Sequence, residues 1–246
     1  MSDPVSVTEA ALLARDQESQ PWQQAFVAML SGPLTREQLI DRVTERIGYA
    51  PRFRRLVTGW PLPTWVDDVG FSVGGHVREA TLAPGERLES WLSAKLQSGL
   101  DRAHSPWEAT LVHGIAPGTT ALVVRTHAAL VDGYDNVHLL QELFDEYAED
   151  ITDVDDAWQP RAAEAFGVAD VLSGLNDPLQ ALKSAATGLV GMVENAVRTA
   201  SATARPQHLA GVEVDLDALA AVRERFGCTT HDVILALATA GVRGWM

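Results

Sequence analysis

The sequence predicts an α/β protein in which a mixed sheet is covered by helices. Short apolar runs typical of strands alternate along the chain with segments of helical period. The 246 residues allow one large domain or two small ones, with ample chain for a core. The hydrophobic content of 46% and the charged content of 21% are ordinary for a soluble globular protein.

The first elements are a strand and a helix that follow a short approach segment. Residues 1–20 are expected to be partly helical, and residues 21–32 form a mainly apolar run that ends in a turn, which indicates a strand. Thr35 with Gln38 three residues later predicts a capping box, and Gly48 predicts the end of that helix. The apolar residues of the helix recur on one face: Leu39, Ile40, Val43 and Ile47.

The next three segments alternate between sheet and helix. Residues 49–82 are rich in Pro, Gly and Trp, which predicts short strands and turns. Residues 85–101 predict a helix, and residues 106–130 predict two adjacent strands joined at Pro117 and Gly118. The face of that helix is made by Leu88, Trp91, Leu92, Lys95 and Leu96.

Beyond the second of these strands the sequence predicts a helix, a linker and a longer helix. The first begins after Gly133, and residues 145–156 read as an acidic solvated linker, since the glycine and the final glutamate of an EF-hand are absent. Residues 177–206 carry an apolar stripe that could face the core, a partner or a membrane surface. The stripe contains Leu179, Leu182, Ala186, Leu189, Val193 and Val197.

The C-terminal residues predict the start of a second domain. Residues 211–227 read as a strand and then a helix, which Asp215 or Asp217 opens and Gly227 closes. Residues 229–246 read as another helix, and they end within an apolar pattern. We therefore expect an N-terminal domain over residues 1–150, a linker with an amphipathic helix over 151–206, and the beginning of a C-terminal domain over 207–246.

Charge, cysteine content and motifs exclude several classes of function. The net charge of −14 argues against a nucleic-acid groove, which needs clustered Lys and Arg. Cys228 is the only cysteine, so a disulfide framework is excluded and a cytoplasmic location is expected. No signal peptide, membrane span, phosphate loop, dinucleotide fingerprint or nucleophile elbow is visible, although peripheral contact with a membrane stays possible. A metal site at His127, Asp132 and His138 is not favoured, because His127 and His138 lie on separate elements.

Several stretches together resemble the wax ester synthase/diacylglycerol acyltransferase family of actinobacteria. They are GPLTREQLIDRVTERIGYAPRFRRLV, HVREATLAPGERLESWLSAKLQSGLDRAHSPWEATLV, HAALVDG and TTHDVILALATAGVRGW, in the order of the family. The resemblance implies a fold like that of chloramphenicol acetyltransferase, acyl-CoA as co-substrate with no bound cofactor or metal, and a lipid alcohol or diacylglycerol as acceptor. It also implies a tunnel between two similar domains, so a C-terminal half on the same or another chain is an expected partner.

The family motif His-His-x-x-x-Asp-Gly aligns with this chain at Asp132 and Gly133. His127 then takes the place of the first histidine, and Ala128 takes that of the second, which in active members removes a proton from the acceptor hydroxyl. Neighbouring side chains on a strand point to opposite faces, so His127 replaces the missing base only if a bulge turns it round. By resemblance, Asp132 and Gly133 hold the turn.

Three further positions are candidates for substrate contacts. The family has Pro-Leu-Trp-Glu where this chain has Trp107 after Ser105 and Pro106, and Asn-Asp where it has His231 and Asp232. The sequence favours Trp107 as a core residue over a substrate contact, and His231 and Asp232 as the capped start of a helix. Two functions stay open: an acyltransferase impaired at Ala128, or a catalytically inactive relative that binds acyl lipids or serves as a scaffold. A weaker third is a rearranged site that uses His127 or His138.

Overall fold

The structure is a computed structural model that describes residues 3–16, 20–59, 63–131, 158–161, 209, 211 and 214–245. The chain divides into two compact units, Met1–His208 and Leu209–Met246, and each unit is described by itself. The expected helix after Gly133, the acidic linker and the amphipathic stripe lie outside the described residues.

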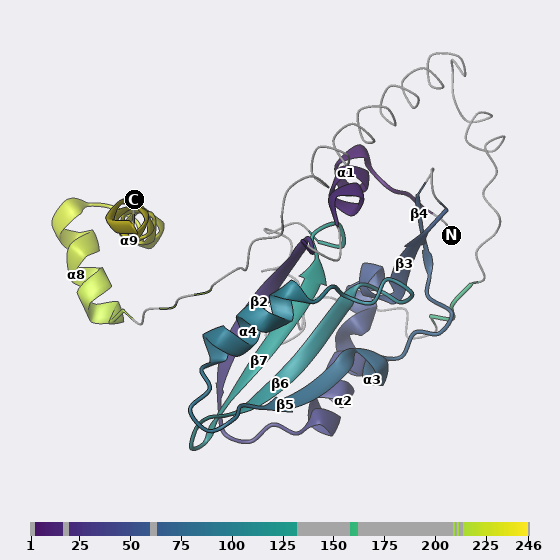
Figure 1. Ribbon diagram of the computed structural model, residues 1–246, viewed down its shortest axis with the longest axis horizontal. Helices are drawn as coiled ribbons and strands as arrows, with labels where there is room; N and C mark the ends of the chain where they lie inside the picture. The colour runs from purple at the N-terminus through teal and green to yellow at the C-terminus, as the bar shows by residue number, and fades with distance from the viewer. Residues whose placement is uncertain are drawn as a thin grey trace, which may run out of the picture. The chain divides into compact units, whose positions relative to one another are not determined.

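The first unit has a mixed α/β architecture (Figure 1). Its strands are β1 (Asp3–Pro4), β2 (Gln23–Ser31), β3 (Arg55–Thr58), β4 (Thr64–Asp67), β5 (Val77–Thr81), β6 (Trp107–Ala116) and β7 (Thr119–His127). Its helices are α1 (Val7–Arg15), α2 (Arg36–Arg46), α3 (Val73–His76) and α4 (Leu88–Gln97), with the 3-10 helices η1 (Ile47–Tyr49) and η2 (Pro51–Arg54). The strands and helices therefore alternate much as the apolar pattern predicts.

The larger sheet has the strand order β2-β7-β6-β5. β6 and β7 form a hairpin whose turn contains Gly118, which adopts a φ of 72° that suits glycine. β2 pairs antiparallel with β7 over its full length, and β5 pairs parallel with β6. A second, smaller sheet has the order β1-β4-β3. The mixed sheet expected from the sequence is confirmed.

Each face of the larger sheet buries its own apolar cluster. On one face α1, α2 and the smaller sheet pack over Leu111, Leu122 and Val124 of β6 and β7. On the other face α4 packs over Val112 and Val123 (Figure 1). Because successive residues of a strand point to opposite faces, both clusters draw on alternating positions of the same strands. A sheet covered on both faces also explains why β7 reads as a nearly continuous apolar run.

Local signals place the helices of the first unit. The α2 helix begins at the predicted capping box, in which Gln38 N–H donates to Thr35 Oγ1 at 3.2 Å and Thr35 N–H donates to Gln38 Oε1 at 2.9 Å. The helix ends at Arg46, close to the stop that Gly48 predicts. Ile47 at the C-cap keeps right-handed angles of −61° and −19°, and the chain continues through η1. In η1 the Ala50 N–H donates to Ile47 O at 3.1 Å in the tighter 3-10 pattern, and Gly48 does not adopt a positive φ.

The second unit contains α8 (Leu216–Phe226) and α9 (Thr230–Trp245). Asp215 caps α8 by accepting from Asp217 N–H at 2.9 Å, and Gly227 ends it in the left-handed conformation with a φ of 61°. Both ends follow the sequence prediction. The strand expected before α8 falls mostly on residues outside the described ranges, and Val214 and Asp215 are not in a strand.

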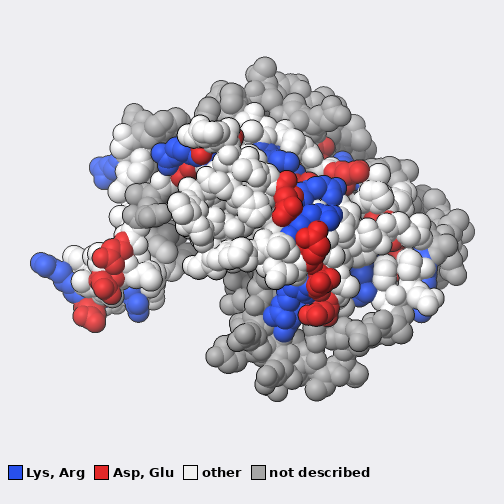
Figure 2. Space-filling view, turned by 90° about the horizontal axis from the view of Figure 1, so that it is seen from below, with Lys and Arg blue, Asp and Glu red and all other residues white. Residues whose placement is uncertain are grey.

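Charged side chains of both signs lie together on the surface. On the face shown in Figure 2, several basic and acidic side chains of the described residues alternate in one column. Within the described ranges, no helix is both long enough and apolar enough to cross a membrane.

Candidate functional site

The motif segment lies at the end of β7, at the same end of the sheet as the starts of β2 and β6. His127 pairs with Gln23 of β2, and the register between these strands is unbroken up to this pair. No bulge therefore turns the His127 side chain round at this point. The His127 N–H donates to Pro106 O at 3.0 Å, and the next N–H, from Ala128, donates to Trp22 O at 3.0 Å. These bonds fix the backbone on both sides of the strand end.

The His127 ring is turned into the protein, where only 2% of the residue is exposed. Its Nδ1 accepts a hydrogen bond from Ala129 N–H at 3.0 Å, so the ring proton resides on Nε2. Nε2 faces Asp16 Oδ2 at 3.4 Å, which is long for a hydrogen bond and is better described as an electrostatic contact. Both ring nitrogens are therefore directed at protein groups, which is the arrangement of a structural histidine.

Asp16 connects this histidine to the segments on either side of it. Its Oδ1 accepts from Trp22 N–H at 2.7 Å, and its Oδ2 lies 3.5 Å from the Arg102 guanidinium. Burial by itself raises the pKa of Asp16, but contacts with His127, Trp22 and Arg102 outweigh burial and leave the pKa below its ordinary value. The ionised Asp16 thus favours the Nε2–H form of His127.

Ala128 has a different environment from its neighbour. It is half-buried, whereas His127 and Ala129 on either side are buried. β7 ends at His127 and Ala128 lies in the turn that follows, so the alternation of strand faces does not extend to this pair. Asp132 and Gly133, which the family motif predicts to hold the turn, lie outside the described residues, as does His138.

Trp107 at the start of β6 is a core residue. It is 5% exposed, its indole N–H donates to Phe53 O at 2.8 Å, and its ring stacks on His76 with centroids 4.6 Å apart. Trp107 also lines the pocket described below, so it has one edge in the core and one at a cavity. A ring held by its own hydrogen bond and by stacking supplies a rigid wall.

His231 and Asp232 belong to the second unit, in the first turn of α9. Thr229 N–H donates to Asp232 Oδ2 at 2.8 Å, and Asp232 N–H donates to Thr229 Oγ1 at 3.2 Å. The hydrogen bond that the Thr229 hydroxyl donates to Asp232 Oδ2, followed by that from the Thr229 N–H, lowers the pKa of Asp232. The carboxylate of Asp232 is therefore engaged in capping the helix.

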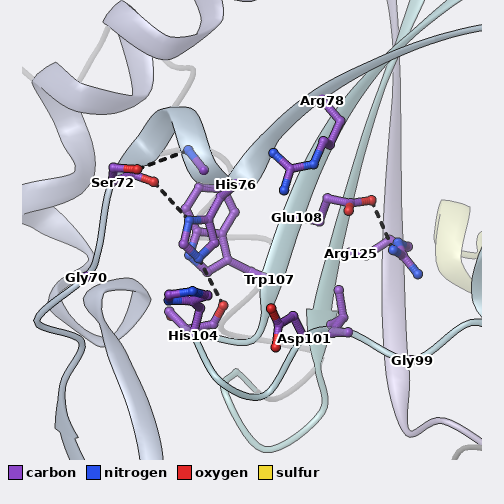
Figure 3. Close-up of a pocket in the computed structure, with 13 residues that line it drawn as sticks. Gly70, Ser72, His76, Arg78, Gly99, Asp101, His104, Trp107, Glu108 and Arg125 are labelled. Atoms are coloured by element: carbon purple, nitrogen blue, oxygen red, sulfur yellow. Dashed lines mark hydrogen bonds and ion pairs between the residues drawn. The ribbon is translucent and has the colours of Figure 1, made fainter.

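A pocket of about 380 Å³ lies beside β5, at the same end of the sheet (Figure 3). It is walled by α3, the start of β5, residues 99–105 and the first residues of β6. Neither His127 nor Ala128 lines it. The side chains that give it chemical character are His76, Arg78, Asp101, His104, Trp107 and Arg125.

His76 is a buried histidine that ties two walls of this pocket together. Its Nδ1 lies 3.0 Å from Ser72 O and its Nε2 lies 3.1 Å from Ser105 O. Two carbonyl partners favour the protonated ring, but burial has the larger effect and the pKa of His76 is lowered. The neutral ring can donate to one carbonyl at a time, so the second contact is not a hydrogen bond in that form.

His104 forms a dyad with Asp68 at the pocket wall. Asp68 is 2% exposed, and its Oδ2 lies 3.1 Å from His104 Nδ1 and accepts from Ser105 N–H at 3.2 Å. Its Oδ1 accepts from Gly70 N–H at 2.9 Å. The His104 side chain is 50% exposed. A half-exposed imidazole oriented by a buried carboxylate is the geometry that proton-transfer sites use.

Arg125 and Glu108 form an ion pair at the far wall (Figure 3). The two groups are 3.0 Å apart, and Lys95 lies 3.9 Å from the same carboxylate oxygen. Burial raises the pKa of Glu108, but the charges of Arg125 and Lys95 dominate and the pKa is lowered. Arg125 also donates to Lys95 O at 2.6 Å. This pair is therefore neutralised within the protein.

The pocket was not predicted from the sequence. No sequence motif singles out the polar residues His76, His104, Asp68 and Arg78. These residues are separated by up to 36 positions along the chain, and they meet only because parallel pairing of β5 with β6 joins the segments before both strands. The one local signal is the pair Asp67-Asp68 at the end of β4, two adjacent carboxylates whose side chains are both largely buried.

Comparison with known proteins gives consistent matches. The model of the wax ester synthase/diacylglycerol acyltransferase catalytic domain matches residues 2–209. A probable diacylglycerol O-acyltransferase of Mycobacterium tuberculosis, tgs3, is 28% identical over 202 residues, which cover 76% of this chain and 74% of the relative. A putative diacylglycerol O-acyltransferase of the same organism is 28% identical over 251 residues, which cover 99% of this chain and 55% of the relative.

A solved structure shares the fold. The wax ester synthase/diacylglycerol acyltransferase from Marinobacter aquaeolei VT8 matches with a TM-score of 0.61 and 20% identity, over 98% of this chain and 59% of that protein. At this identity the likeness shows the fold, which agrees with the fold class expected from the sequence. Apart from tgs3, this chain spans about half the length of these relatives.

Proposed function

We propose a function for this chain from its family, because the chain belongs to the wax ester synthase/diacylglycerol acyltransferase family. It is the N-terminal part of an acyl-CoA-dependent O-acyltransferase of the wax ester and triacylglycerol type, and its activity is impaired because Ala128 occupies the base position. Its co-substrates are a long-chain acyl-CoA and a lipid alcohol or diacylglycerol. The names of the relatives and the fold shared with the Marinobacter enzyme support this assignment.

The reaction needs a base near the acceptor hydroxyl. An alcohol is a poor nucleophile at neutral pH, and imidazole is the side chain best suited to remove its proton. The alkoxide oxygen forms a bond to the thioester carbonyl carbon, the carbon–sulfur bond breaks, and the proton passes to the CoA thiolate. A methyl group at position 128 neither accepts nor returns that proton.

The inward orientation of His127 carries the proposal. Its Nδ1 accepts from Ala129 N–H and its Nε2 faces Asp16, so neither nitrogen is available to a substrate hydroxyl. A positioned general base contributes roughly 10² to 10⁴ in rate, or about 3 to 5 kcal/mol. The chain as it stands therefore lacks a contribution of that size.

We propose the following division of the chain into domains. Residues 1–150 form the acyltransferase-like domain, residues 151–206 a linker with an amphipathic helix, and residues 207–246 the beginning of a C-terminal domain. Asp132 and Gly133 hold the turn after β7. The protein acts in the cytoplasm or at the inner face of a membrane or a lipid droplet.

Ala128 also favours a second candidate function, that of a catalytically inactive relative that binds acyl lipids or serves as a scaffold. The two functions differ in what a restored histidine does. In an impaired enzyme the rest of the site is intact and Ala128→His restores turnover. In an inactive relative the acyl chain binds without turnover whatever occupies position 128.

The test is an acyl-transfer assay with palmitoyl-CoA and either hexadecanol or diolein, measured as CoA thiol release and as ester product. It uses the chain as found, alone and mixed with the C-terminal half of a family relative, beside Ala128→His. We expect the variant to exceed the chain as found by about 10²- to 10⁴-fold. Binding of a fluorescent acyl-CoA is measured in parallel.

A matched control adds an imidazole elsewhere on the surface. Ala83→His places one on an exposed turn between β5 and α4 and should leave the rate unchanged. Acyl-CoA binding without turnover in Ala128→His supports the inactive relative instead. Equal turnover by the chain as found and Ala128→His, or loss of turnover in a folded His127→Ala variant, shows that the base has been assigned wrongly.

A further inference from the structure

We propose that the pocket beside β5 binds a small ligand that carries both an anionic group and hydroxyl groups, of the class of phosphorylated polyols. This proposal goes beyond acyl transfer and does not rest on it, because the pocket includes neither His127 nor Ala128. Arg78 binds the anionic group, and the His104–Asp68 dyad accepts a hydrogen bond from a ligand hydroxyl.

Arg78 is the cation that the protein leaves available at this pocket. Its side chain extends from the start of β5, and its hydrogen bond within the described residues is a long one of 3.4 Å from Nη1 to Val77 O. Arg125, the other arginine of the pocket, is committed to Glu108 at 3.0 Å and to the carbonyl of Lys95. A guanidinium with unused donors recognises phosphate by paired hydrogen bonds.

His104 supplies an acceptor on the opposite side of the pocket from Arg78 (Figure 3). Asp68 Oδ2 accepts from Ser105 N–H and lies 3.1 Å from His104 Nδ1, and a carboxylate acceptor at that distance favours the His104 ring proton on Nδ1. Nε2 is then an unprotonated acceptor, and no contact of Nε2 with another described residue is seen. An oriented imidazole nitrogen that stays half-exposed is suited to a ligand hydroxyl.

Asp101 and Ser105 favour a hydroxylated ligand over a simple anion. The Asp101 carboxylate lines the pocket with one oxygen engaged by Ala103 N–H at 2.9 Å, so it repels a bare anion and accepts from a hydroxyl. Ser105 is 2% exposed and its Oγ has no hydrogen-bond partner among the described residues. A buried hydroxyl without a partner is uncommon, and a small shift of this wall lets a ligand satisfy it.

The size of the pocket agrees with this class of ligand. Its volume of about 380 Å³ lies near the lower end of small-molecule sites, which span roughly 300 to 1,000 Å³. The lining is largely polar and charged, so it suits a compact polar molecule and not an acyl chain.

The test is isothermal titration calorimetry of the full chain with glycerol 3-phosphate and ribose 5-phosphate, with inorganic phosphate and glycerol as partial probes. We expect saturable binding of at least one sugar or glycerol phosphate with one site per chain, about 10-fold tighter than inorganic phosphate. Arg78→Gln should weaken this binding about 10-fold or more. His104→Ala should reduce it to the level of inorganic phosphate.

The matched control is Arg87→Gln, which removes an exposed arginine that pairs with Glu89 outside the pocket and should leave binding unchanged. Absence of saturable heat with both phosphorylated polyols overturns the proposal. So does an equal loss in Arg87→Gln and Arg78→Gln, which indicates non-specific attraction, or binding of inorganic phosphate as tight as that of the polyols. Circular dichroism of each variant confirms that it is folded.

Discussion

The end of β7 and the pocket beside β5 lie at the same end of one sheet, yet they use histidine in opposite ways. At the end of β7, His127 is 2% exposed and both ring nitrogens are directed at protein groups. In the pocket, the His104 side chain is 50% exposed, and Asp68 orients one nitrogen while the other is left for a ligand. Each imidazole lies near an aspartate, so the pairing alone does not distinguish them.

The two histidines differ in whether a ring nitrogen is left to accept a hydrogen bond from a ligand. The Ala129 N–H occupies Nδ1 of His127, which leaves the ring no acceptor for a substrate. His104 has its carboxylate on Nδ1 and keeps Nε2 as an acceptor. His127, which lies in the family motif, therefore has no ring nitrogen left to accept a hydrogen bond from a ligand. His104, which lies in a loop outside the motif, keeps one.

The largest effect on stability should come from Asp68→Ala. This change leaves Gly70 N–H, Ser105 N–H and His104 Nδ1 without their acceptor at a buried position. We expect the free energy of unfolding to fall by about 2 to 5 kcal/mol, measured by urea denaturation. Asp101→Ala is the matched control in the same pocket, because this exposed carboxylate accepts one hydrogen bond, from Ala103 N–H, within the part of the chain that the structure describes. Its expected cost is below about 1 kcal/mol, and equal costs would remove the distinction between an orienting and a peripheral carboxylate.

A smaller effect is expected from pH, because the buried histidine and the paired carboxylates lose their contributions to stability over different pH ranges. The pKa of buried His76 is lowered, so below about pH 6.5 the unfolded chain binds a proton that the folded chain does not. Stability is therefore full above that pH and declines below it. The lowered pKa values of Asp16 and Glu108 add stability above the ordinary carboxyl range, and this is lost as the pH falls through their folded values.

Melting temperatures measured from pH 8 to pH 3 test whether stability falls first in the histidine range and then in the carboxyl range. The wild-type chain should lose stability first in the histidine range and again in the carboxyl range, with about 1.4 kcal/mol for each unit of difference between folded and unfolded pKa. His76→Gln should abolish the first decline and keep the second. A melting temperature that stays constant down to pH 5 would contradict the neutral, buried state of His76.

Much of the first unit could be predicted from sequence because its signals are local. The β6–β7 hairpin follows from two apolar runs about a Pro-Gly turn, and the α2 start follows from Thr35 and Gln38. The 3-10 turn that follows α2 could not be predicted, because it depends on how η1 and η2 pack. The expectation that residues 127 and 128 point to opposite faces stays a prediction, because β7 ends at His127 and Ala128 lies in the following turn.

The pocket could not be predicted because it depends on contacts between distant segments. Asp68 meets His104 only after β4, β5 and β6 are in place, and nothing in the sequence shows that Asp68 is buried while Asp101 is exposed. The contact of His127 with Asp16 is a long-range feature of the same kind. Sequence patterns locate helices and strands. The protonation behaviour of a titratable side chain depends on its burial, which tertiary packing decides.

Modification by diethyl pyrocarbonate, followed residue by residue by mass spectrometry, tests the contrast between the two histidines most directly. The reagent acylates an unprotonated imidazole nitrogen that solvent can reach. We predict rapid labelling of His104 and strong protection of His127 in the folded chain, with a new labelled site in Ala128→His. Labelling of His127 as fast as that of His104 would show that its ring faces the solvent and would contradict the assignment of Ala128 as the missing base.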